Sequence, residues 1–398
     1  MSARRVYFDH NASTPIHPEV AAAVQPFLGD LFGNPSSIHW AGREVRKPVE
    51  DARAEIASFY GCRPLEVVFT SSGTEADNLA VKGVAYRPGN AGKHIVTSQV
   101  EHPAIMNTCR FLETQGFRVT YVPVNRQGIV EPDAVRSALA KDTILVSVMA
   151  ANNETGCLMP IGEIGAIARE AGVLMHTDAV QATGKVPLAW ETLPVDLLTF
   201  SAHKVNGLKG AGGLIVRKGV EVEAVTHGGH QERGRRGGTE NVVGIIAMGK
   251  AFSLLSRNME AEAAEVRRLR DAFERAIFAR IPDIALNGHP TLRLPNTVNL
   301  SFRFVEGEAL LLNLDMMGIA CSSGSACTSG SLEGSPILLA MGADPTDSQG
   351  ALRFSLGYGN TDDDVAYAVD AIETVVDKLR AMSPLYHPRE GKCSTSKI

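Results

Sequence analysis

The feature that most restricts the fold of this chain is the alternation of apolar and helix-like segments between Val67 and Phe200. The segments with strand character are VVFT, HIVTS, VTYV, TILVSVM, VLMHT and VDLLTF. Strands that alternate with helices form a mostly parallel sheet covered on both faces. The segment Gly213–Val216 follows Phe200 without room for a helix, so we expect that strand to run antiparallel. The pattern therefore predicts an α/β fold.

The C-terminal third has a different pattern. A long charged helix is expected over roughly Asn258 to Ile281, and the first 40 residues are expected to be irregular. Strand-like TVNLSF, helix-like EALLLNLDMMG, strand-like LRFSLG and a last helix from about Thr361 then indicate a smaller α+β unit. We expect a large domain over residues 16–260, a small domain over 1–15 and 261–383, and a flexible tail over 384–398.

Composition narrows the class of protein. The 398 residues have a formal net charge of −5, which gives no support for binding to nucleic acid or to anionic membranes. The chain shows neither a secretory signal nor an apolar run of membrane-spanning length, so we expect a cytoplasmic protein. Its 6 cysteines are too scattered for a disulfide framework or a structural zinc site, which leaves a chemically active thiol as a possibility.

Polar residues follow several of the predicted strands. They are Gly73 with Thr74, His102, Asn153, Asp178 with Gln181, and Ser201 with His203 and Lys204. The carboxyl ends of parallel strands meet at one edge of a sheet, which is where such sheets bind ligands. These positions together therefore predict one site.

The chemistry of these residues points to one cofactor. The SSGT segment opens a helix whose free N–H groups suit a phosphate, and Ser201 and His203 would extend that cradle. Asp178 ends a buried strand and needs a cationic partner, such as a protonated ring nitrogen. Lys204, at the end of another buried strand, has the position expected of a Schiff-base lysine. With His102 stacked on the ring, this set indicates a pyridoxal-phosphate site.

Each residue also has a simpler explanation. SSGT and Asp178 are ordinary helix N-caps, and His102 is a structural histidine in this alternative. Asn153 and Gln181 would be turn or capping residues, and Lys204 a solvated loop lysine. The GLKGAGG loop lacks the GK[ST] ending of a P-loop, and no GxGxxG follows the first strand.

Seven segments resemble motifs of the NifS-type cysteine desulfurases, which belong to the class V aminotransferase group of fold-type-I pyridoxal-phosphate enzymes. They are SGTEADN, EHPAI, ANNETG, HTDAVQ, SAHK, GGHQERGRRGGTEN and SSGSACTSGSLE. The likeness extends from about Val6 to Met382, with the motifs in order. The resemblance implies a mostly parallel, seven-stranded type of sheet with helices on both faces, plus the smaller α+β domain.

The resemblance also implies roles for single residues. Lys204 would bind pyridoxal 5′-phosphate as a Schiff base and move protons on the substrate, and Asp178 would keep the pyridine nitrogen protonated. His102 would stack on the ring with an acid–base role, and Gln181 would lie near the phenolic oxygen. The phosphate ligands would be Gly73, Thr74, Ser201 and His203, with Thr239 donated by the partner subunit of a homodimer with a shared active site. Asn153, also counted as cofactor-binding, and Arg353 would hold the substrate carboxylate.

Cys327 is the expected nucleophile. It lies in a run of Ser, Gly and Thr that cannot pack a core, whereas Cys321 follows the apolar MMGIA and fits a buried thiol. A thiolate is the reactive form, so Cys327 needs a lowered pKa or a local base. The resemblance implies that L-cysteine displaces Lys204 and that Cys327 then attacks the substrate sulfur. L-alanine and a persulfide on Cys327 result.

The same resemblance implies an iron–sulfur scaffold protein as the persulfide acceptor. No intrinsic metal is expected, apart from transient ligation of an iron–sulfur cluster by Cys327 together with the scaffold. The segments GGHQERGRRGGTEN and FVEGEALLL favour a role in nitrogenase maturation. The chain departs from its relatives at Gly334, where they commonly have proline, and this puts the stiffness of the Cys327 loop and its docking in doubt.

Other functions fit parts of the pattern. A selenocysteine lyase or another class V enzyme, such as a small-substrate transaminase, shares the fold, but a transaminase does not need Cys327. A catalytically silent scaffold that only binds assembly partners is the alternative from another class. The complete set of Lys204, Asp178, His102, Arg353 and Cys327 argues against it.

Overall fold

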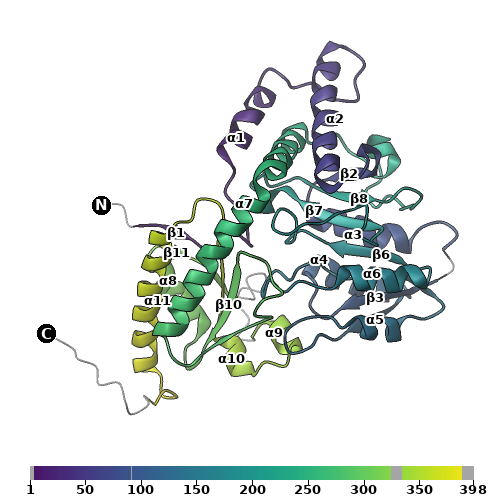
Figure 1. The fold of residues 1–398 in the computed structure, drawn as a ribbon. Coiled ribbons are helices and arrows are strands. Elements are labelled where there is room, and N and C mark those ends of the chain that lie inside the picture. Colours follow the sequence, from purple (N-terminus) through teal and green to yellow (C-terminus); the bar gives the residue numbers. More distant parts are fainter. Residues whose placement is uncertain (1–3, 91, 324–333, 388–398) are drawn as a thin grey trace.

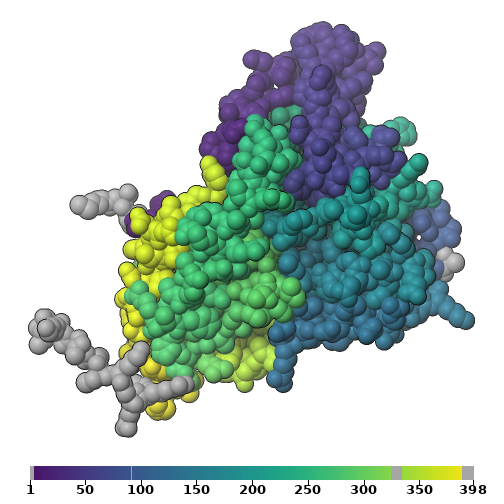
Figure 2. Space-filling model, in the orientation of Figure 1, coloured from purple at the N-terminus to yellow at the C-terminus, as the bar shows by residue number. Residues whose placement is uncertain are grey.

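The computed structural model describes residues 4–90, 92–323 and 334–387, and two sheets dominate it (Figure 1). The large sheet has seven strands in the order β2-β8-β7-β6-β5-β3-β4, and the small sheet has four in the order β12-β13-β10-β9. In Figure 2 the C-terminal part, green to yellow, packs directly against the blue and teal part that holds the large sheet. No helix among the described residues is long and apolar enough to cross a membrane.

The large sheet has the predicted mostly parallel arrangement. Its strands are β2 (Val67–Thr70), β3 (His94–Ser98), β4 (Arg118–Val122), β5 (Thr143–Ser147), β6 (Leu174–Asp178), β7 (Leu197–Ser201) and β8 (Gly212–Val216). Neighbours from β4 to β7 pair in parallel, and β8 pairs antiparallel with both β7 and β2, as expected for a strand without a crossover helix. The carboxyl ends of β2, β3, β5, β6 and β7 therefore meet at one edge.

Both faces of the large sheet are buried, which explains why its strands are continuous apolar runs. Alternate residues of a strand point to opposite faces. Thus Ile95 and Leu145 belong to one core, with α3 (Gly73–Ala85) and α4 (Pro103–Thr114), while Val96 and Val146 belong to another. That second core includes α2 (Trp40–Tyr60), α6 (Ile161–Glu170) and α5 (Pro132–Ala138).

The helix α7 (Val242–Arg280) joins the two parts of the molecule (Figure 1). The prediction that this helix starts near Asn258 was wrong, because its first half is apolar and lacks the charged face used to recognise the second half. That half lies buried against α2, and a Cβ on Gly249 would lie 2.4 Å from the Cβ of Ala52. Glycine here lets the two helices approach closely.

The N-terminal stretch also differs from the prediction. Residues expected to be irregular include α1 (Pro18–Val24), followed by the 3₁₀ helix η1 (Gln25–Leu28). The side chain of His17 caps α1 by accepting from the amide of Glu19, and Val20 and Val24 are buried against α7. A helix this short is marginal alone, so tertiary packing decides its formation.

The small sheet forms the predicted α+β unit. It consists of β9 (Ile284–Leu286), β10 (Thr297–Phe302), β12 (Ser322–Ser323) and β13 (Ala351–Ser355), and β1 (Val6–Tyr7) pairs separately with β11 (Ile319–Ala320). The helices are α8 (Gly307–Met316), α9 (Pro336–Ala340), α10 (Pro345–Gln349) and α11 (Asp362–Met382). Its core contains Phe273 of α7 and Phe354 of β13. Because α7 continues across residue 260, the proposed domain limits stay a prediction, and most of the predicted tail lies outside the described residues.

Candidate active site

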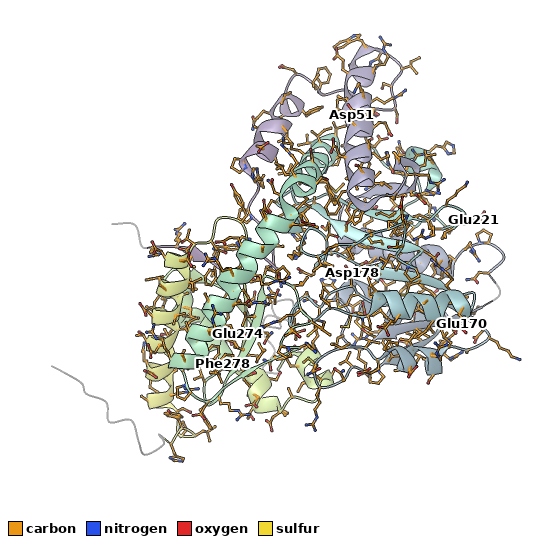
Figure 3. All side chains as sticks on the ribbon, viewed as in Figure 1. Asp51, Glu170, Asp178, Glu221, Glu274 and Phe278 are labelled. Atoms are coloured by element: carbon orange, nitrogen blue, oxygen red, sulfur yellow. The ribbon has the colours of Figure 1, made fainter. Side chains whose placement is uncertain are left out.

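The predicted strand ends lie at one edge of the large sheet, and Asp178 is labelled there in Figure 3. Asp178 is the last residue of β6, and β7 ends at Ser201, directly before the 3₁₀ helix η3 (Ala202–Lys204). His102 is the N-cap of α4, in the connection from β3 to α4. Because β7, β6, β5 and β3 are consecutive in the sheet, these side chains share one site, as predicted.

Two carboxyl groups lie together beside His102. Ligand atoms of Asp77, His102 and Asp178 are all within 4.8 Å of one another, and both carboxyl groups are buried. Burial raises the pKa of Asp178, and burial followed by the charge of Asp178 raises the pKa of Asp77 well above its ordinary value. His176, 3.7 Å from Asp77, does not compensate, because burial lowers its pKa to about 3. The pocket therefore favours a bound cation.

A second part of the site suits a phosphate. The Ser72 hydroxyl caps α3 by accepting from the amide of Glu75, so the simple capping explanation is correct for that residue. A Cβ on Gly73 would lie 2.9 Å from Val180, so the space favours glycine there, and the next residue of this first turn, Thr74, is exposed. The buried Ser201 hydroxyl has no hydrogen-bond partner among the described residues. Burial, then the charge of Lys204, lowers the pKa of His203 to about 4.

Lys204 is partly buried and points at the N-terminal segment. Its Nζ donates to the carbonyl oxygen of Asn11 at 2.5 Å and to that of Ala12 at 2.8 Å. The side chain of Gln181 donates to the same Asn11 oxygen at 2.9 Å. Lys204 and Gln181 therefore meet through one carbonyl group. These contacts are not those of a solvated loop lysine.

Arg353 of β13 and Asn153, from the segment after β5, lie in contact. Nη1 of the buried Arg353 donates to the Asn153 carbonyl at 3.0 Å, and Nη2 pairs with Asp9 Oδ1 at 2.7 Å. Within the described residues, Arg353 Nε and the buried Asn153 Oδ1 have no hydrogen-bond partner. A planar cation beside an amide is suited to a carboxylate.

Several residues of the site were not predicted. Asp77 lies one helical turn after Thr74, so a buried acid on that face was a usable signal. Asp9 and Asn11 were assigned only to turns, because nothing local shows that β1 returns the N-terminus to the site. Lys185 lies outside every strand end and motif that indicated the site.

Two further predicted site residues stay predictions. Cys327 lies outside the described residues. Thr239 is exposed in the loop before α7, and its expected place in a second copy stays a prediction. Cys321 is buried, and burial raises the pKa of its thiol, as expected for a packed cysteine.

The segment that carries Cys327 ends in a tightly packed stretch. A Cβ on Gly334 would lie 2.3 Å from the Ser348 hydroxyl of α10. The next residue, Ser335, donates to the buried Glu154 at 2.5 Å and caps α9. The glycine at position 334 is thus explained by close packing, since a proline ring would occupy the same space.

Comparison with known proteins agrees with this fold and site. The chain belongs to the aminotransferase class V family, whose model matches residues 6–367. Within it, cysteine desulfurase IscS of Dictyoglomus turgidum is 50% identical over 381 residues, which are 96% of this chain and 97% of the relative. A solved NifS-like protein superposes with a TM-score of 0.89 at 36% identity, covering 94% of this chain and 100% of that one. A structure of SspA in complex with cysteine has a TM-score of 0.79 at 33% identity, covering 88% and 98%. The resemblance and the fold class are confirmed.

Proposed function

We propose that this protein is a pyridoxal 5′-phosphate-dependent cysteine desulfurase. It would convert L-cysteine to L-alanine and leave the sulfur as a persulfide on Cys327. The observation that carries the proposal is the meeting of a buried carboxyl pair, a histidine and a lysine at one edge of the large sheet. The desulfurase relatives support the choice of substrate.

The described residues fit this cofactor. Asp178 would pair with the pyridine nitrogen, His102 would lie on the ring, and Gln181 would face the phenolic oxygen. The first turn of α3, with Ser201 and His203, would hold the phosphate, and the unpartnered Ser201 hydroxyl supplies a donor there. When bound, the group supplies an electron sink that weakens the bonds at the substrate's α and β carbons.

Side chains of the protein would carry out the remaining steps of the reaction. Arg353 and Asn153 would bind the substrate carboxylate and so aim the thiol group of L-cysteine. Lys204 would move protons at its Nζ, and burial, which lowers the pKa of His102, leaves a neutral imidazole able to accept one. The Cys327 thiolate would attack the substrate sulfur, forming an S–S bond as the bond from sulfur to the β carbon breaks. The carbon skeleton, after protonation, leaves as alanine.

We further propose a cytoplasmic homodimer that passes its persulfide to an iron–sulfur scaffold protein, with nitrogenase maturation as the favoured use. Large apolar side chains near α1 and α2 support a subunit contact, since Phe32 is 74% exposed, Ile38 86% and Trp40 60%. In this dimer we expect Thr239 of one copy to bind the phosphate in the other, as the resemblance implies.

The test uses the full chain loaded with pyridoxal 5′-phosphate. Incubation with L-cysteine and a reductant should give sulfide and alanine in equal amounts, and L-selenocysteine in parallel measures selectivity. Without stoichiometric alanine the assignment fails.

The variant Cys327→Ala distinguishes the desulfurase from a transaminase. It should bind the cofactor but lose sulfide release by at least about a hundredfold. Cys321→Ala is the matched control, because that thiol is buried. Retained turnover in C327A would exclude a persulfide on Cys327.

A further inference from the structure

A second lysine, Lys185, lies beside the candidate active site. It follows Gln181 on the turn after β6, and Gly184 before it has a φ of +74°. A Cβ on Gly184 would also lie 3.0 Å from Leu255 of α7. Glycine is favoured at this position on both grounds, and the turn holds Lys185 in place.

Lys185 is joined to Lys204 through a continuous set of hydrogen bonds. Its Nζ donates to the Gln181 carbonyl oxygen at 2.9 Å and to Gln181 Oε1 at 3.2 Å. With Oε1 occupied in this way, Nε2 of Gln181 faces the Asn11 carbonyl at 2.9 Å, the acceptor that Lys204 also uses. An amide nitrogen has two hydrogens, so Nε2 keeps one for a ligand.

The surroundings of Lys185 are those of an active-site side chain rather than of a surface charge. Lys185 and Lys204 line one cavity together with His10 and Glu262. Burial, then the charges of Lys204 and Arg353, lowers the pKa of Lys185 to about 7. An amine donates hydrogen bonds whether or not it is protonated, so its bonds to Gln181 persist on both sides of that pH.

We propose that Lys185 is a positioning residue of the active site, which holds the Gln181 amide with its NH₂ group toward Asn11 and Lys204. The inference rests on the proposed function, because Gln181 acts there on the phenolic oxygen of the cofactor. Without Lys185 the amide is free to turn, and its oxygen would then meet the electron-rich Asn11 carbonyl. A lysine with a purely structural role would tie the turn together without affecting the chemistry at Lys204.

The test is a double-mutant cycle on the holoenzyme, read by absorbance. The measured quantity is the pH midpoint at which the Schiff base of Lys204 loses its proton. Lys185→Met and Gln181→Leu should each raise the midpoint, by about one pH unit. Loss of the Gln181 donor at the phenolic oxygen favours the protonated form.

The double variant should show no further rise, because K185M acts through Gln181. Lys185→Arg should keep the midpoint of the parent, and Lys141→Met, at an exposed lysine before β5, is the matched control.

The outcomes separate the possibilities. The proposal is overturned if K185M unfolds at the same temperature as the parent and has the same pH midpoint. It is also overturned if the midpoint shift of the double variant equals the sum of the K185M and Q181L shifts. If K185M does not fold, Lys185→Gln takes its place in the cycle under the same criterion. A parent that forms no Schiff base with pyridoxal 5′-phosphate refutes the proposed function itself, and the role of Lys185 falls with it.

Discussion

At the scale of single residues, the carboxyl pair of Asp178 and Asp77 dominates the site. Both groups are buried, and Asp77 Oδ1 has no hydrogen-bond partner among the described residues. An uncompensated buried carboxylate is costly, so the fold retains this pair at the expense of stability. Retention at such a cost is typical of functional groups.

Replacing Asp178 by asparagine keeps the size of the side chain but removes its charge. We expect Asp178→Asn to lower kcat by about a hundredfold, because a preorganised charge opposite the ring nitrogen is lost. The absorbance titration with pyridoxal 5′-phosphate should also show weaker binding. Asp133→Asn, at a side chain 97% exposed, is the control. Unchanged kcat and cofactor affinity in D178N would contradict the assignment.

Arg353 is expected to recognise the substrate rather than the cofactor. Arg353→Lys replaces a planar fork by a point charge, so KM for L-cysteine should rise about tenfold or more while the cofactor spectrum is unchanged. Steady-state kinetics measure the effect, with Arg303→Lys at an exposed ion pair as the control. If KM stays constant, another group binds the carboxylate.

At the scale of elements, packing decides where several segments begin and end. The first half of α7 is helical because α2 and the large sheet cover its apolar surface. Gly334 and Ser335 are held in place beside α9 and α10, since Ser335 donates to Glu154 and Gly334 lies close to Ser348. These contacts join the two residues to the turn that carries Asn153.

Gly334 provides a direct test of this packing. In Gly334→Ala the new Cβ would lie 2.7 Å from the Cβ of Ser348, so the two backbones must separate. We expect a loss of about 1–3 kcal/mol in the free energy of unfolding. Urea denaturation measures it, and Gly29→Ala, which has no neighbour within 4 Å, is the control. Equal stability of the two variants would show that α10 is not held there.

At the scale of the whole molecule, buried carboxyl groups make the stability of the folded protein depend on pH. Burial raises the pKa of Glu101 to about 8, although Ser98 and the amide of Met149 donate to its carboxylate. Burial raises the pKa of Glu154 to about 7. The folded protein holds these protons more tightly than the unfolded chain, so this contribution to stability is lost as pH rises from the ordinary value of 4.5 to about 7 for Glu154 and about 8 for Glu101.

Glu101→Gln removes one of these titrations. Between pH 5 and pH 8 the unfolding free energy of E101Q relative to the parent should shift in favour of the variant, by more than about 1 kcal/mol. Glu191→Gln, at an exposed acid, should show no such trend. Parallel pH profiles for E101Q and the parent would mean that Glu101 is ionised in the folded protein.

Much of the site was predictable because its residues follow strands. His102, Asp178 and Lys204 could be recognised from their neighbours in the sequence, because each lies at or shortly after the end of an apolar strand. The carboxyl ends of parallel strands meet at one edge of the sheet. Asp9, Asn11 and Asp77 were not predictable in this way. Their roles depend on which segment crosses the sheet edge, and hydrophobic periodicity carries no such information.

The sequence by itself determined the alternation of strands and helices, the edge of the sheet where ligands bind and the family of the protein. These follow from local patterns and motifs. Tertiary structure alone decided the partners of the reactive groups. Asn11 reaches Lys204 because β1 pairs with β11, and Lys185 orients Gln181 because Gly184 turns the chain. The physical reason is that hydrogen bonds between residues distant in the sequence depend on which segments lie side by side in the folded protein, and only the packed core determines this.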